Sequence, residues 1–246
     1  MKRFLVILIF LTLLSGSAMS DAPPKDSEFI FARLQCGQRE VWRQFWNEAP
    51  WHHDYPFSDE FLSGMLKELT NVHVTSTSYQ IVQLASPEIF KYPFLYLSEP
   101  GFMRLSDEEV TNLGEYIRRG GFIMADDFRT ANYLHGPEEL EILRGYLKRA
   151  VPERELVRLD VHDPIFHSVY NIDTLKMDPP YGGDVPGFVP EFWGMYDDHG
   201  NLQLIANYNN DLGEFWEWTD KGEKPLHPAV RSIQLGVNYL IYAMSH

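Results

Sequence analysis

Two adjacent aspartates follow a run of apolar residues and are the first candidates for chemistry in this sequence. Residues 120–128 read GGFIMADDF, so Asp126 and Asp127 come where a short buried strand would end. In an open α/β sheet, ligands bind beyond the carboxyl ends of the strands. A carboxylate there can act as an acid or base, or bind a cation. In the structural alternative, one aspartate caps the next helix and the other is solvated.

Glu99 and Arg33 are predicted to lie at the same edge of the sheet. Glu99 follows the apolar run 94–97, and Arg33 stands at the end of the first predicted strand. Parallel strands end together, so we expect one acidic pocket of Glu99, Asp126 and Asp127, partly neutralised by Arg33. Clustered carboxylates repel, which raises the pKa of at least one of them or recruits a cation. A simple salt bridge among these residues is the structural alternative.

Histidines supply a second group of candidates. His162 and His167 bracket a proline turn in the segment HDPIFH, and with Asp163 or Asp126 they could bind a divalent metal. His167 is also a candidate for acid–base chemistry in the acidic pocket. In the structural alternative, one histidine is exposed and the other is hydrogen-bonded. The run His-His-Asp at 52–54 lies in a tryptophan-rich stretch and is expected to line a groove or face solvent.

The segment NYNNDLGEFWEW carries a third group. Asn210 and Asp211 suit a tight turn and a helix cap, and Trp216 follows among alternating aromatic and acidic residues. Indole rings beside amides and carboxylates are typical of carbohydrate-binding surfaces and also of a tightly packed hairpin end. In the first interpretation, Asn210, Asp211 and Trp216 bind ligand, and the segment around Trp216 forms a wall of the acidic pocket.

The elements that must position these residues follow a strand–helix–strand pattern. Residues 94–97 suit a strand, and Ser106 with Glu109 predicts a capping box that opens a helix ending at residues 118–119. Residues 122–125 suit the next strand. Such a unit is right-handed and its two strands are parallel.

Hydrophobic periodicity places the remaining elements. Further strands are predicted at 29–34, 72–75, 79–84, 156–159 and 202–208. Further helices are predicted at 58–70, 137–149 and 230–243, with a helical turn at 87–90. A hairpin is expected around the turn DDHG that precedes the last strand. The fold class is therefore α/β, with a mostly parallel sheet and a late β-hairpin.

The first twenty residues have the layout of a secretory signal peptide. Two basic residues precede an apolar run at 4–14, and small residues lead to Ser20. We expect a signal peptide at 1–20, a polar leader at 21–28 and a single domain at 29–246, in an exported and most simply periplasmic protein. An uncleaved anchor is the alternative.

The composition of the chain limits the classes of molecule that it is expected to bind. The chain of 246 residues has a formal net charge of −14, which argues against nucleic acid and anionic membranes. We expect a polar small molecule, a glycan or an envelope protein instead, and no membrane span after signal cleavage. Cys36 is the only cysteine, so an internal disulfide is impossible.

Four segments, in order, resemble a bacterial family known as domain of unknown function 4159: FIFARLQCG, YPFLYLSEPGFMRLSDEEVTNLGEYIRRGGFIMADDF, HDPIFHSVYNI and NYNNDLGEFWEW. That family is similar to class I glutamine amidotransferase-like proteins, so the resemblance implies a flavodoxin-like three-layer sandwich of that type. In catalytic members a cysteine follows the strand equivalent to 122–125, where this chain has Asp126 and Asp127. Cys36 follows the first strand instead, and no late His-x-Glu pair is present. The resemblance therefore argues against glutaminase chemistry.

Two functions remain open. The first is a noncatalytic module that binds a polar ligand or envelope partner at the acidic, aromatic edge. The second is a metal-dependent or acid–base hydrolase that uses Asp126, Asp127, Glu99 and a histidine. The missing nucleophile favours the first, and the converging acids support the second. No cofactor is predicted, although a divalent metal would suit the acids.

Overall fold

The computed structural model describes residues 25–39, 48–128, 138–178 and 189–246. The expected signal peptide and the first part of the polar leader lie outside these residues.

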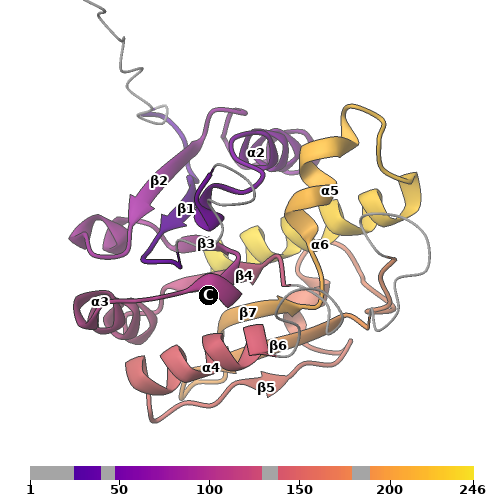
Figure 1. The fold of residues 1–246 in the computed structure, drawn as a ribbon. Helices are drawn as coiled ribbons and strands as arrows, with labels where there is room; N and C mark the ends of the chain where they lie inside the picture. Colours follow the sequence, from indigo (N-terminus) through magenta and orange to yellow (C-terminus); the bar gives the residue numbers. More distant parts are fainter. Residues whose placement is uncertain (1–24, 40–47, 129–137, 179–188) are drawn as a thin grey trace, which may run out of the picture.

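A mixed seven-stranded sheet forms the centre of the molecule, in the order β2-β1-β3-β4-β7-β6-β5 (Figure 1). The parallel part contains β1 (Phe31–Gln35), β2 (Tyr79–Gln83), β3 (Phe94–Ser98), β4 (Phe122–Asp126) and β7 (Leu202–Tyr208). The antiparallel strands are β6 (Glu191–Tyr196) and β5 (Val157–Arg158). The parallel strands follow an order used by doubly wound sheets, in which the direction of winding reverses between β1 and β3.

Helices cover both faces of the sheet, which gives three layers (Figure 1). One face carries α3 (Asp107–Arg118) and α4 (Glu138–Ala150), and the other carries α2 (Phe57–Leu69), α5 (Leu212–Thr219) and α6 (Leu226–Ser245). Successive side chains of a strand point to opposite faces, so each face has its own core. On β3, Leu95 and Leu97 pack beneath α3 and α4, whereas Phe94 and Tyr96 pack on the other side. Short 3-10 helices are η2 (Pro50–His52), η3 (Pro87–Lys91), η4 (Pro100–Phe102) and η5 (Pro164–His167).

The predicted capping box is confirmed and also connects two loops. Ser106 Oγ accepts from Glu109 N at 3.2 Å, and Glu109 Oε2 accepts from Ser106 N at 2.8 Å. The other oxygen, Glu109 Oε1, accepts from Gly37 N at 2.7 Å. One carboxylate therefore fixes both the start of α3 and the loop that follows β1.

Two sequence predictions of secondary structure are wrong. Residues 72–75 form no strand. Val74 packs into the core, but the segment pairs with no strand of the sheet. The segment after β7 is the helix α5, so the alternative of a packed hairpin end is wrong, whereas the predicted helix cap at Asp211 is confirmed. Asp211 caps this helix by accepting from Glu214 N at 2.9 Å. Capping and contact with the core override the local alternation.

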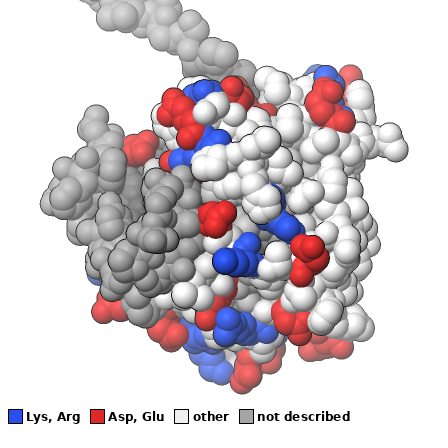
Figure 2. Space-filling model, turned by 90° about the vertical axis from the view of Figure 1, so that its right-hand side faces the viewer, with Lys and Arg blue, Asp and Glu red and all other residues white. Residues whose placement is uncertain are grey.

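Charged residues lie both on the surface of the molecule and in its interior. On the face shown in Figure 2, acidic and basic residues are scattered among uncharged ones. Several aspartates, in contrast, are buried, among them Asp54, Asp59, Asp126, Asp127 and Asp211. Among the described helices, none combines the length and apolarity needed to cross a bilayer.

Candidate functional site

Buried and half-buried carboxylates converge near the carboxyl ends of β1, β4 and β7. They come from the turn before α2, from the residue after β4 and from the start and middle of α5. We call them the acidic cluster: Asp54, Asp127, Asp211, Glu214 and Glu217. Lys224 Nζ lies 2.5 Å from Glu214 and Lys221 Nζ lies 4.0 Å from Glu217. The buried Asp54 and Asp127 need a further compensating proton or cation.

Two overlapping sets of potential ligand atoms share Asp54. Atoms of His53, Asp54 and Asp127 lie within 4.8 Å of one another, and so do atoms of Asp54, Glu214 and Glu217. Carboxylate oxygens with one imidazole nitrogen are donors that divalent cations accept. Asp54 is the residue around which a cation site would be built.

The Asp54 carboxylate is buried without a donor. Asp54 is 6% exposed, and neither of its carboxylate oxygens has a hydrogen-bond partner among the described residues. His53 Nδ1 lies 3.4 Å from Oδ1 without hydrogen-bond geometry. Glu217 is close enough to share a proton with Asp54, but an ionised carboxylate cannot donate. Burial of an ionised carboxylate without compensation is costly, so a proton or a cation must be present.

The pKa values of Asp54 and Asp127 are raised because both carboxylates are buried beside other acids. Burial raises the pKa of Asp54 well above its usual range, and the carboxylates of Asp211, Asp127 and Glu214 raise it further. The charge of Arg33 only partly opposes this. Burial also raises the pKa of Asp127, again with help from Asp211. Without a cation, Asp54 and Asp127 therefore retain protons above the pH at which an ordinary aspartate would lose them.

Unusual backbone conformations occur beside the cluster. Asp54, Glu99, Asp127 and Asn209 have φ values of 64°, 55°, 63° and 58°. Left-handed backbone is uncommon for residues other than glycine, although aspartate and asparagine tolerate it. Such residues concentrate at functional sites, where the surrounding structure maintains them. The backbone thus aims two members of the cluster, Asp54 and Asp127, in directions that a regular strand or helix would not allow.

The sequence predicts that Asp126 lies in the ligand pocket, but its carboxylate accepts hydrogen bonds from the protein itself. Its Oδ1 accepts from Asn207 Nδ2 at 2.8 Å. Its Oδ2 accepts from Leu212 N at 2.9 Å, Gly213 N at 3.0 Å and Tyr96 OH at 3.2 Å. Burial raises the pKa of Asp126 to about 6, while these hydrogen bonds lower it. Asp126 attaches the start of α5 to the sheet and so positions the acidic residues of that helix.

Arg33 does not pair with the acids that follow β3 and β4. It is fully buried, and its Nε and Nη2 donate to Asp59 at 3.0 and 2.5 Å. Its Nη1 donates to the carbonyl oxygens of Trp51 and His53 at 3.1 and 2.8 Å. Arg33 therefore fixes the turn that presents Asp54, rather than neutralising a pocket of Glu99 and the aspartates.

Glu99 lies at the expected edge but in neither set of ligand atoms. Ser98 pairs with Asp126 in the sheet, and Glu99 N donates to Asp126 O at 3.1 Å. The prediction that β3 and β4 end together is confirmed by this register. Among the described residues, however, the potential ligand sets contain Asp127 but not Glu99 or Asp126.

Trp216 and Asn210 are buried and contact other parts of the protein. Trp216 is fully buried in the core between the sheet and α6, so the prediction that it forms a wall for ligand is wrong. Asn210 is also buried; its carbonyl accepts from Phe128 N and its Oδ1 accepts from Asp211 N, each at 3.0 Å. Asn210 thus shapes the turn that delivers Asp211 to the acidic cluster.

The histidines of HDPIFH lie apart from the cluster. His162 is exposed, and the neighbouring Asp163 binds Tyr196 at the end of β6, which is the opposite edge of the sheet. His167 is hydrogen-bonded on both ring nitrogens, to Asn171 Oδ1 and Val161 O, each at 2.6 Å. Neither histidine belongs to a potential metal-ligand set in the described part of the chain.

Sequence reasoning missed four of the residues that now define the site. The sequence predicts only that His53 and Asp54 line a groove or face solvent, and it does not single out Glu214 or Glu217 as site residues. The signal for the two glutamates was their spacing of three, which places both on one side once the segment is a helix. Nothing local marks Asp54, because its neighbours in the cluster are distant in sequence.

Comparison with known proteins gives a family but no activity. The family model described as Domain of unknown function (DUF4159) matches residues 30–244, so the chain belongs to that family. No curated protein matches the sequence.

Proposed function

We propose that this member of the DUF4159 family is a binding domain whose acidic cluster holds a divalent cation. The observation that carries the proposal is the Asp54 carboxylate, which is buried without a hydrogen-bond donor among the described residues. Burial and then the neighbouring acids raise the pKa values of Asp54 and Asp127, and a cation would neutralise both carboxylates together.

The donor set indicates which cations to test. Carboxylate oxygens suit Mg²⁺, Ca²⁺ and Mn²⁺, and imidazole suits transition metals. One set offers oxygens of Asp54 and Asp127 with a nitrogen of His53, and the other offers oxygens of Asp54, Glu214 and Glu217. Mn²⁺ accepts both kinds of donor, so it is the first probe.

Burial favours cation binding over catalysis on a substrate. Asp54 and Asp127 are only 6% and 3% exposed. The side chains of Glu214 and Glu217 are 13% and 16% exposed, and they lie 2.5 Å from Lys224 Nζ and 4.0 Å from Lys221 Nζ. A cation that binds Asp54 together with these glutamates competes with the two lysines for their oxygens. The hydrolase alternative is supported by the raised pKa values, because catalytic acids often have them. That alternative requires a substrate to contact residues that are almost inaccessible.

The test is calorimetric titration of the purified chain after treatment with EDTA. We expect one equivalent of Mn²⁺ to bind, and Asp54→Asn to weaken binding at least about tenfold because a charged ligand is lost. Asparagine tolerates the left-handed backbone at residue 54, so this variant should fold. The matched control is Asp173→Asn, which removes a carboxylate that is 77% exposed. Equal binding by wild type and Asp54→Asn would refute the proposal.

A finer fold assignment and the cellular location form part of the same proposal. The order of the parallel strands supports an amidotransferase-like sandwich. The Cys36 thiol is buried, and burial raises its pKa, which makes a nucleophilic thiolate unfavourable. We place the protein outside the cytoplasm because of its signal-like start. Mass spectrometry of exported protein that still carries residues 1–20 would contradict cleavage after Ser20.

A further inference from the structure

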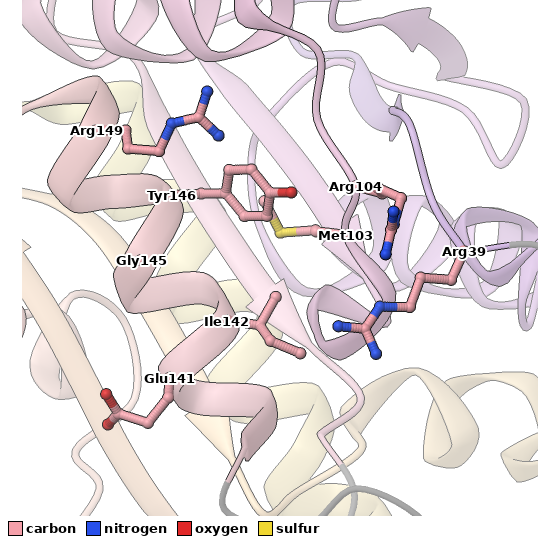
Figure 3. Close-up of a pocket in the computed structure, with 8 residues that line it drawn as sticks. All are labelled: Arg39, Met103, Arg104, Glu141, Ile142, Gly145, Tyr146 and Arg149. Atoms are coloured by element: carbon pink, nitrogen blue, oxygen red, sulfur yellow. The ribbon is translucent and has the colours of Figure 1, made fainter.

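A separate cavity lies on the α3 and α4 side of the sheet (Figure 3). Its volume is about 360 Å³, and its lining includes Arg39, Met103, Arg104, Ile142, Tyr146 and Arg149. None of these residues belongs to the acidic cluster. The cavity therefore raises its own question, which is what three arginines and an apolar wall would bind.

The loops after β1 and β3 form one side of this cavity. Arg39 follows β1 and Arg104 follows β3, and the order of the parallel strands reverses between these two strands. Open α/β sheets bind ligands at this reversal. Backbone hydrogen bonds join the loops, from Arg39 N to Phe102 O at 2.8 Å and from Arg104 N to Gly37 O at 2.7 Å. Both arginines thus project from a connected backbone at the expected ligand position.

The lack of room at Gly37 shows how closely the two loops approach. A Cβ atom there would lie 2.4 Å from Arg104 O, which is closer than packed atoms allow. The contact keeps the loops together, and α4 closes the other side of the cavity. In Figure 3, Ile142 and Tyr146 project from α4 toward the arginines, whereas Glu141 points away.

Two of the three arginines have no acidic partner in the described part of the chain. Arg149 pairs with Asp107 at 2.7 Å, and Glu141 pairs with Arg144 at 3.2 Å. No ion pair or side-chain hydrogen bond joins Arg39 or Arg104 to a described residue, and Arg39 Nε is buried without a partner. In a chain whose formal charge is −14, this local excess of positive charge is unusual.

We propose that the cavity binds a small organic anion, with a phosphate or carboxylate group on an apolar body. The forked donors of Arg39 and Arg104 match either oxyanion, since guanidinium binds both in a bidentate manner. Met103, Ile142 and the Tyr146 ring contact the apolar part. Tyr146 OH also accepts from Leu105 N at 3.1 Å, which fixes the ring. The volume lies within the usual range for small-molecule sites.

The test is NMR titration of the full chain with phenyl phosphate, benzoate and the neutral benzyl alcohol. EDTA is present throughout, so that the result does not depend on the cation site. We expect at least one of the two anions to bind and benzyl alcohol not to bind. The preferred anion identifies the oxyanion that the cavity takes.

Substitutions locate the binding. Arg104 is exposed, so Arg104→Gln should fold normally and weaken anion binding at least about tenfold. Arg39→Gln is the second variant and should have the same effect. The control, Arg119→Gln, removes an equal charge from an exposed arginine that pairs with Glu115 at 2.8 Å, outside the cavity. Failure of both anions to bind, equal binding of benzyl alcohol, or unchanged binding by both cavity variants would each overturn the proposal.

Discussion

Asp126 and Asp54 are both buried carboxylates on the α5 side of the same sheet edge, yet their surroundings are opposite. Asp126 accepts four hydrogen bonds, from Asn207, Leu212, Gly213 and Tyr96. The Asp54 carboxylate has no hydrogen-bond partner among the described residues and lies beside other acids. Both aspartates lie next to Gly213. Its N–H donates to Asp126, and a Cβ at this position would lie 2.5 Å from Asp54 Oδ2.

The difference separates a structural acid from a functional one. A buried charge that has enough donors contributes to a unique fold, because removing it leaves those donors unsatisfied. A buried charge without donors destabilises the fold unless something else neutralises it. The first arrangement needs no ligand, and the second does. Mutations at the two positions should therefore have opposite effects on stability.

The largest expected effect is at the structural acid. Asp126→Ala should lower the free energy of unfolding by about 3–5 kcal/mol, because it leaves buried donors at the start of α5 without an acceptor. Urea unfolding followed by circular dichroism measures this. The exposed Asp173→Asn should change stability by less than about 0.5 kcal/mol. A similar small change in Asp126→Ala would remove the distinction between the two aspartates.

The next effect is stabilisation by the cation. With Mn²⁺ at about 100 times its dissociation constant, linkage gives about 2.7 kcal/mol, or a rise in Tm of about 5–10 °C. Asp54→Asn should abolish most of this rise, while Asp173→Asn should retain it. Differential scanning calorimetry with and without EDTA measures both. A rise in Tm that is equal in all three proteins would place the cation elsewhere.

The smallest effect is the pH dependence of the metal-free protein. The pKa of Asp54 is raised above 3.8, so its proton stabilises the folded state at low pH, and that contribution is lost as pH rises through the folded pKa. Asp54→Asn cannot lose this proton. In EDTA, the variant should match wild type near pH 4 and become more stable by about 1 kcal/mol or more near pH 8.

Thermal unfolding of the two proteins at several pH values gives this comparison. A difference between them that does not change with pH would show that the pKa of Asp54 is not raised in the folded protein. Addition of Mn²⁺ should end the advantage of the variant at high pH, because the cation stabilises wild type and the variant binds it weakly.

Local patterns determined most of the framework of this protein. Continuous apolar runs at 94–97 and 122–125, together with the confirmed capping box at Ser106 and Glu109, predicted β3, α3 and β4. Parallel strands must end at one edge, so the sequence also placed Asp127 and Glu99 there. These features depend on residues close together in the chain and on rules that hold for all such sheets.

Only the tertiary structure decided which acids share a site. The segment of Glu214 and Glu217 alternates like a strand, but it is a helix because Asp126, distant in sequence, binds its first N–H groups. Arg33 pairs with Asp59 of α2, and Asp54 joins the cluster from the turn that precedes α2. Side-chain partners depend on which segments pack together in space. That packing reflects the free energy of the whole fold rather than any local pattern.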